Sequence, residues 1–183
     1  KFFLISSILL YLSCSSDLEG LNVDQKNATS APADAFFNLG VKNMSDLLSG
    51  ITFGATVNPW NNSRLLVQQI SSVTYNEGST YYLNFDWNSV YQGVLINLKQ
   101  SAKVLENAEN SSDPVSQNKL AIVEIMQVYT YSRLVEAFGN IPYTEALDVN
   151  NISPKYDDAE TIYLDLLNRL STAINNLDES QPS

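Results

Sequence analysis

Side chains suited to binding a sugar gather in one part of this sequence. Aromatic rings pack on the apolar faces of sugar rings, while amide and carboxylate groups bind the hydroxyl groups. Both types occur in segments whose Gly, Pro and Asn content is typical of loops. Each aromatic side chain could instead pack beneath its own loop, and that alternative stays open. The candidate glycan contacts are Trp60, Asn61, Tyr75, Glu77, Tyr81 and Tyr82.

The residue types needed for catalysis are poorly represented. The 183 residues include no histidine, so a nucleophile activated by histidine is excluded. No pair of acidic residues stands in the apolar surroundings that a glycosidase acid requires. The stretch that begins at Asp148 fails as a calcium loop, because Ser153 and Ala159 replace the required Gly and Glu. We therefore expect neither an enzyme nor a bound cofactor or metal.

The single cysteine, Cys14, ends an apolar stretch that begins after Lys1. This stretch is too short to span a membrane and is typical of a secretory signal. The boundary at Ser13 and Cys14 resembles the bacterial lipoprotein signal, in which a peptidase cuts before the cysteine and the cysteine carries lipid. We expect residues 1–13 to be a signal peptide and Cys14 to be lipidated. A free cysteine in a first helix is the alternative.

The remaining chain divides into a tether and a domain. Residues 14–33 are polar and lack a periodic apolar pattern, as expected for a flexible tether. Residues 34–183 are long enough for one compact domain. The net charge of −10 comes with no basic cluster, which argues against nucleic acid as a partner and leaves the lipid as the only membrane contact.

Helical periodicity dominates residues 34–183. No stretch alternates long enough to predict a strand, so we predict an all-α fold. Helices that follow one another through short loops favour tetratricopeptide-like helix pairs in an irregular bundle, although no fixed repeat is present and a plain bundle stays open. The predicted helices cover residues 37–48, 64–73, 87–105, 120–138 and 157–177.

Three local signals refine these helices. Gly139 and Asn140, with Pro142 shortly after, predict the end of one helix. Asp157 with Glu160 three residues later predicts a capping box at the start of the next. Trp87 and Tyr91 share a helix face and are expected in the core.

Three segments together resemble the SusD/RagB family, in particular its starch-binding branch associated with the outer membrane. They are FDWNSVYQGVLINL (85–98), FGNIPYTEAL (138–147) and PKYDDAETIY (154–163). The resemblance implies a helical lipoprotein on the exterior of the outer membrane in Bacteroidetes-type bacteria. It implies capture of a glycan or another nutrient and its transfer to a SusC-type TonB-dependent transporter, without enzymatic activity. It also implies that this chain is the N-terminal part of a longer domain.

The family motifs themselves have a structural interpretation, because they fall at helix caps and turns. Phe138 and Tyr143 are expected to pack the chain back onto the helices. The ligand site is therefore expected elsewhere, in the loops. A helical scaffold lipoprotein that binds other proteins and no small ligand stays open as the second function.

Overall fold

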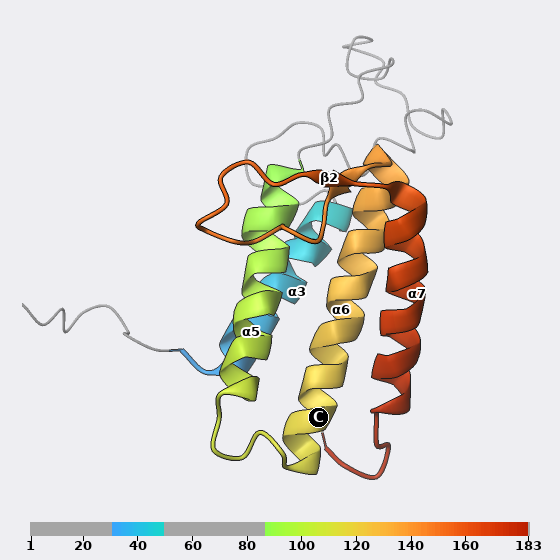
Figure 1. Cartoon of the computed structure of the whole chain (residues 1–183). Helices are drawn as coiled ribbons and strands as arrows, with labels where there is room; N and C mark the ends of the chain where they lie inside the picture. The colour runs from blue at the N-terminus through green and yellow to red at the C-terminus, as the bar shows by residue number, and fades with distance from the viewer. Residues whose placement is uncertain (1–30, 50–86, 183) are drawn as a thin grey trace, which may run out of the picture. The chain divides into compact units, whose positions relative to one another are not determined.

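The computed structural model describes residues 31–49 and 87–182, and all of these except Ala31 belong to a unit that begins at Pro32. Neighbouring helices lie side by side: α3 packs on α5, α5 on α6, and α6 on α7, which runs in the opposite direction to α6 (Figure 1). This confirms the predicted all-α fold. The helices are α3 (Ala33–Ser49), a π-helical turn η3 (Val90–Leu95) continuous with α5 (Ile96–Glu106), α6 (Pro114–Phe138) and α7 (Ala159–Asn175).

The core lies between these helices and takes one residue from the connection after α6. Its largest fully buried apolar side chains come from η3, α5, α6, α7 and the short strand β1 (Ile141–Pro142), and they are Leu95, Leu98, Leu134, Ile141 and Ile162. Trp87 and Tyr91 are partly buried and pack against this core, as expected. Apolar side chains remain exposed on the outer side of α7, at Leu164, Leu167 and Ile174.

The contact between α3 and the η3–α5 helix is close because α3 carries a glycine there. A Cβ atom at Gly40 would lie 3.2 Å from the Leu98 side chain and 3.4 Å from the carbonyl oxygen of Val94. About one turn further along α3, the Asn43 amide donates to the Gly93 carbonyl at 2.7 Å. Backbone proximity and a side-chain hydrogen bond together fix the position of α3 on its neighbour.

The π-helical turn is a feature that the apolar periodicity did not predict. The prediction was a regular helix over 87–105, whereas residues Val90–Leu95 form the wider turn. Within this turn the Gly93 carbonyl accepts hydrogen bonds from both Asn43 and Asn97, at 2.7 and 2.8 Å. The carbonyl is thus bound by side chains, an arrangement compatible with a local change in helical hydrogen bonding.

Helix α6 begins earlier than predicted and ends as predicted. Pro114 occupies its first turn after Asp113, which has extended backbone. Apolar periodicity missed this first part because a polar residue, Asn118, is buried there. The Asn118 amide donates to the Asp178 carbonyl at 2.8 Å and accepts from the Asp178 backbone N–H at 2.7 Å. At the other end, Gly139 caps the helix with a φ of +74°, which favours glycine.

The predicted capping box of the last helix is wrong by one residue. Helix α7 begins at Ala159, and its N-cap is Asp158, whose carboxylate accepts from the backbone N–H groups of Glu160 and Thr161. Asp157 lies in the short strand β2 (Tyr156–Asp157), which pairs antiparallel with β1 (Ile141–Pro142). Its carboxylate is engaged across the connection and is not available to cap the helix.

Candidate functional site

The residues predicted to contact glycan, from Trp60 to Tyr82, and the predicted lipidation site Cys14 all lie outside the described residues. The structure does describe the residues on either side of the segment 50–86, namely Ser49 at the end of α3 and Trp87 before η3. The candidate site is therefore built from the side chains around Trp87. These belong to the connection between α6 and α7, residues 139–158, which we call the α6–α7 loop.

Two aromatic residues from distant parts of the sequence meet at Trp87. Its ring lies 5.6 Å from that of Tyr156 and 5.5 Å from that of Phe138, measured between centroids. The Tyr156 side chain is 59% exposed, so Trp87 supports a ring that is open to solvent. An exposed aromatic ring with a fixed neighbour is the type of surface on which a sugar ring packs.

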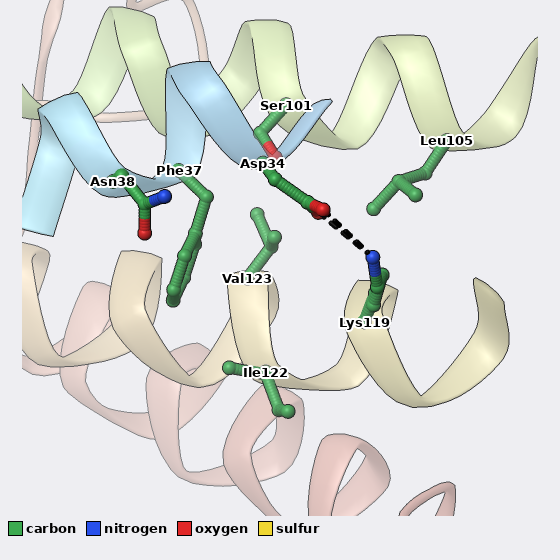
Figure 2. A pocket seen from close by; sticks show the side chains of 8 residues that line it. All are labelled: Asp34, Phe37, Asn38, Ser101, Leu105, Lys119, Ile122 and Val123. Carbon is green, nitrogen blue, oxygen red and sulfur yellow. Dashed lines mark hydrogen bonds and ion pairs between the residues drawn. The ribbon is translucent and has the colours of Figure 1, made fainter. Parts of the chain in front are cut away.

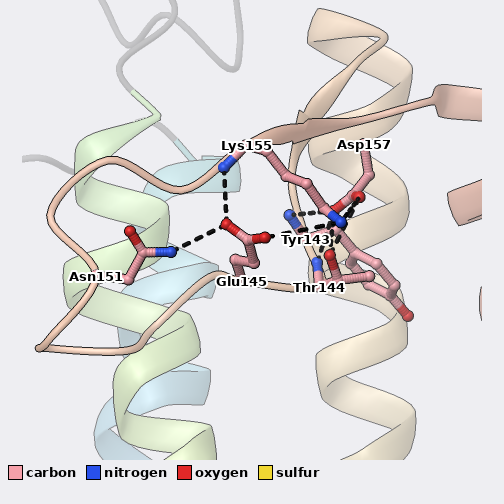
Figure 3. A network of polar contacts seen from close by, with 6 residues as sticks. All are labelled: Tyr143, Thr144, Glu145, Asn151, Lys155 and Asp157. Atoms are coloured by element: carbon pink, nitrogen blue, oxygen red, sulfur yellow. Dashed lines mark hydrogen bonds and ion pairs between the residues drawn. The ribbon is translucent and has the colours of Figure 1, made fainter.

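A polar network holds the outer part of the α6–α7 loop (Figure 3). One oxygen of Glu145 accepts from the Asn151 amide at 3.0 Å and from the backbone N–H of Lys155 at 3.2 Å. The backbone hydrogen bond from Lys155, followed by the one from Asn151, lowers the pKa of Glu145. The carboxylate is therefore ionised at neutral pH, and its hydrogen bonds join residues 145, 151 and 155 of the loop.

Asp157 performs the same role nearer the helices. Its carboxylate accepts from the backbone N–H groups of Thr144 at 2.7 Å and Tyr143 at 3.2 Å, and from the Thr144 hydroxyl (Figure 3). The backbone bond from Thr144 is the main cause that lowers the pKa of Asp157. Because Asp157 is adjacent to Tyr156, these bonds also fix the backbone that carries the exposed ring.

A second cluster attaches the loop to α6 and α7. Arg169 forms a bidentate pair with Glu124, at 2.5 and 3.0 Å, and donates to the Tyr143 hydroxyl at 2.7 Å. Burial lowers the pKa of Arg169, but the hydrogen bonds and charge interactions with Glu124 and Tyr143 together outweigh burial, so the net shift is upward. The Tyr143 hydroxyl in turn donates to Asp165, and burial with this bond raises its pKa to about 12.

The interior tyrosines complete this attachment. Tyr143 packs edge-on against Tyr131 at 4.8 Å, and the Tyr91 hydroxyl donates to the carbonyl of Pro142 at 2.5 Å. Burial raises the pKa of both Tyr91 and Tyr131, so neither hydroxyl ionises near neutral pH. The expectation that Tyr143 and Phe138 pack the chain onto the helices is confirmed, since both lie partly buried against the core.

The described part of the chain shows neither a metal-binding cluster nor a membrane-spanning helix. Across residues 31–49 and 87–182, no group of three or more His, Cys, Asp or Glu side chains is arranged to hold a metal ion. None of the helices in these ranges combines the length and apolar character needed to cross a bilayer. The described side chains of the loop offer an exposed aromatic ring and hydrogen-bonding groups.

Sequence reasoning missed Tyr156, because its segment was interpreted as a helix start. The sequence carries no local signal for it, because the hydrogen bonds that hold its neighbour Asp157 come from Tyr143 and Thr144, 14 and 13 positions earlier. Tyr156 cannot be recognised as a partner of Trp87 from the sequence alone, since the two residues are 69 positions apart.

Comparison with known proteins assigns the chain to a class. The sequence model of a SusD-like family, described as starch-binding and associating with the outer membrane, matches residues 28–183. A search of curated proteins finds no match. The match spans most of the chain, and the helical fold agrees with it.

This chain therefore belongs to the SusD-like family, as its three sequence segments indicated. Membership associates it with starch or glycan binding at the outer membrane.

Proposed function

We propose that this chain is a lipoprotein on the exterior of the outer membrane that captures a glycan and delivers it to a SusC-type TonB-dependent transporter. In this account it acts by binding, without catalysis. The observation that carries the proposal is the family match over residues 28–183, which associates starch binding with the outer membrane. The exposed Tyr156 ring on Trp87 supplies a surface with the required chemistry.

The glycan contacts are proposed to come from the segment 50–86 and from Tyr156. Trp60, Asn61, Tyr75, Glu77, Tyr81 and Tyr82 supply rings, an amide and a carboxylate. In the sequence this segment lies between α3 and Trp87, and Trp87 contacts Tyr156. This connection supports one continuous site, because Trp87 follows the segment 50–86 in the sequence and contacts the α6–α7 loop through Tyr156.

Calorimetric titration of the full chain with maltoheptaose tests these contacts. Trp60→Ala and Tyr156→Ala are each expected to weaken binding by about tenfold, which is the loss of one well-packed ring. Tyr163→Ala is the matched control, because this tyrosine is 43% exposed but lies on α7. Equal affinity in the wild type and in both site variants would contradict the proposed contacts.

The membrane attachment is proposed to rest on Cys14. Residues 1–13 would be removed as a signal peptide, and residues 14–33 would tether residues 34–183, the N-terminal part of a SusD-like domain, to the lipid. Metabolic labelling with a fatty acid and fractionation of membranes test this. Cys14→Ala is expected to abolish labelling and release the protein from the outer membrane, and labelling retained in this variant would refute the assignment.

The transporter partnership is tested by co-purification. Tagged full-length chain, extracted from the outer membrane of its own host in mild detergent, is expected to bring a TonB-dependent transporter with it. Recovery of the chain without any such transporter, from membranes shown to contain one, would argue against delivery while leaving glycan binding untouched.

A further inference from the structure

A pocket of about 310 Å³ lies between α3, α5 and α6 (Figure 2). It shares no residue with the α6–α7 loop, so it is separate from the site described above. Its walls come from the first two turns of α3, the second half of α5 and the first half of α6. The lining residues are Asp34, Phe37, Asn38, Ser101, Leu105, Lys119, Ile122 and Val123.

One side of this pocket is apolar. Phe37 points from α3 toward α6, on the side of α6 that carries Val123 (Figure 2), and Ile122 also lines the pocket. Val123 and Leu105 are 2% and 8% exposed, whereas Phe37 is only partly buried and keeps part of its ring accessible. An aromatic ring backed by aliphatic side chains is suited to the C–H face of a sugar ring.

The other side carries hydrogen-bonding groups of both kinds. The Lys119 ammonium lies 2.9 and 3.0 Å from the two oxygens of Asp34, an ion pair that Figure 2 shows meeting across the pocket. The Asp34 side chain is 63% exposed, and pairs this exposed contribute little to stability. Ligand hydroxyls can therefore bind both groups at small cost, with Lys119 donating and Asp34 accepting.

Two more polar groups extend this side. The Ser101 hydroxyl lines the base of the pocket, where it is only 1% exposed, and it donates to the Ala33 carbonyl at 2.9 Å. Asn38 is exposed beside Phe37, and its amide offers both a donor and an acceptor. The pocket thus joins one apolar wall to a polar edge, which matches the two faces of a pyranose.

We propose that this pocket is a second carbohydrate subsite, which holds one end of a pyranose-based oligosaccharide. Its volume is at the lower end of the range of about 300–1,000 Å³ for ligand pockets, which suits one or two rings. The inference rests on the proposed function, because the ligand class is the glycan that the chain captures. If one stretch of a polysaccharide binds at the segment 50–86 and another stretch binds in this pocket, a single protein molecule holds the polysaccharide at two points.

The test is calorimetric titration of the full chain with maltotriose, together with amide NMR spectra. Phe37→Leu removes the ring but keeps an apolar side chain, and its matched control is Phe36→Leu at the adjacent position. The double variant Asn38→Ala/Lys119→Gln removes polar contacts, and its control is Lys42→Gln, which breaks an exposed ion pair with Asp46 on the same helix. Thermal unfolding verifies that each variant is folded.

Both pocket variants are expected to weaken maltotriose binding at this subsite by about tenfold, the effect of one or two lost contacts, with controls unchanged. Maltotriose should also shift the amide signals of Asn38 and Val123. Binding that is equal in all variants, without these shifts, overturns the subsite while the proposed function stands. No maltotriose binding at all overturns the subsite, and the maltoheptaose titration then shows separately whether glycan capture fails as well.

Discussion

Asp157 and Asp158 are neighbours with the same side chain, but their carboxylates bind different elements. Asp158 accepts from the first N–H groups of α7, while Asp157 accepts from Tyr143 and Thr144 across the loop. The pair thus joins a helix start to a loop return at a single point in the chain. Alternation along the backbone sends the two side chains in opposite directions, which makes this division possible.

Asp157→Asn is expected to make the free energy of unfolding depend less on pH in the acid range. The backbone bond from Thr144 lowers the pKa of Asp157 in the folded state, so the ionised group stabilises the fold above the unfolded pKa of about 4. This stabilisation is lost as the pH falls through the folded pKa. Urea unfolding from pH 7 to pH 2 should show the variant less stable at pH 7 and close to the wild type at pH 2.

Glu109→Gln, in the exposed connection between α5 and α6, is the control for this titration. It removes a carboxylate that makes no such backbone contacts in the described structure. A constant difference between the Asp157→Asn variant and the wild type across the whole pH range would contradict the assigned role.

Gly139→Ala should destabilise the chain by about 1 kcal/mol or more, because the φ of +74° at this cap is strained for any residue with a Cβ atom. No atom lies within 4 Å of the Cβ position, so strain in the backbone is the only source of the loss. Gly93→Ala is the control in a helical turn, where the added Cβ would make an ordinary contact at 3.5 Å. Denaturant unfolding should rank Gly139→Ala below Gly93→Ala, and the reverse order would disprove the argument.

At the scale of elements, the loop is held by a small number of side chains from the helices. Arg169 of α7 binds Glu124 of α6 and Tyr143 of the loop, and Tyr91 of η3 binds the carbonyl of Pro142. The loop therefore depends on three helices for its position. This dependence explains why the exposed Tyr156 ring can be kept in a fixed orientation over Trp87.

Arg169→Met should lower the free energy of unfolding by about 2 kcal/mol, since it leaves Glu124 partly buried and unpaired. The comparison is Arg133→Met, which breaks an i,i+3 pair with Glu136 that is more exposed. That variant should lose less than about 1 kcal/mol. Thermal and urea unfolding measure both, and equal losses would show that the Arg169 cluster does not brace the loop.

Regular elements could be predicted from the sequence because their signals are local. The apolar face of α3, the cap at Gly139 and the amphipathic α7 depend on residues a few positions apart. The start of α6 and the π-helical turn could not, because Asn118 and Asn43 bind groups 60 and 50 residues away. A side chain that forms a hydrogen bond with a distant backbone group produces no periodic pattern in the local sequence.

At the scale of the whole molecule, sequence patterns identified the family but not the arrangement of the site. Residue types singled out Trp60 and the segment around Tyr81, which lie outside the described residues. The pairing of Trp87 with Tyr156 emerges only when α6 and α7 bring the ends of the loop back to η3. The pocket between α3, α5 and α6 likewise brings together Asp34 and Lys119, which are 85 positions apart in the sequence.

Electrophoresis of the full chain in a gel that contains amylopectin tests the central claim, glycan capture, most directly. The chain is expected to migrate more slowly there than in a gel without polysaccharide, and free maltoheptaose is expected to restore its mobility. Equal mobility in both gels would contradict starch binding by this chain and would favour a helical scaffold lipoprotein that binds other proteins.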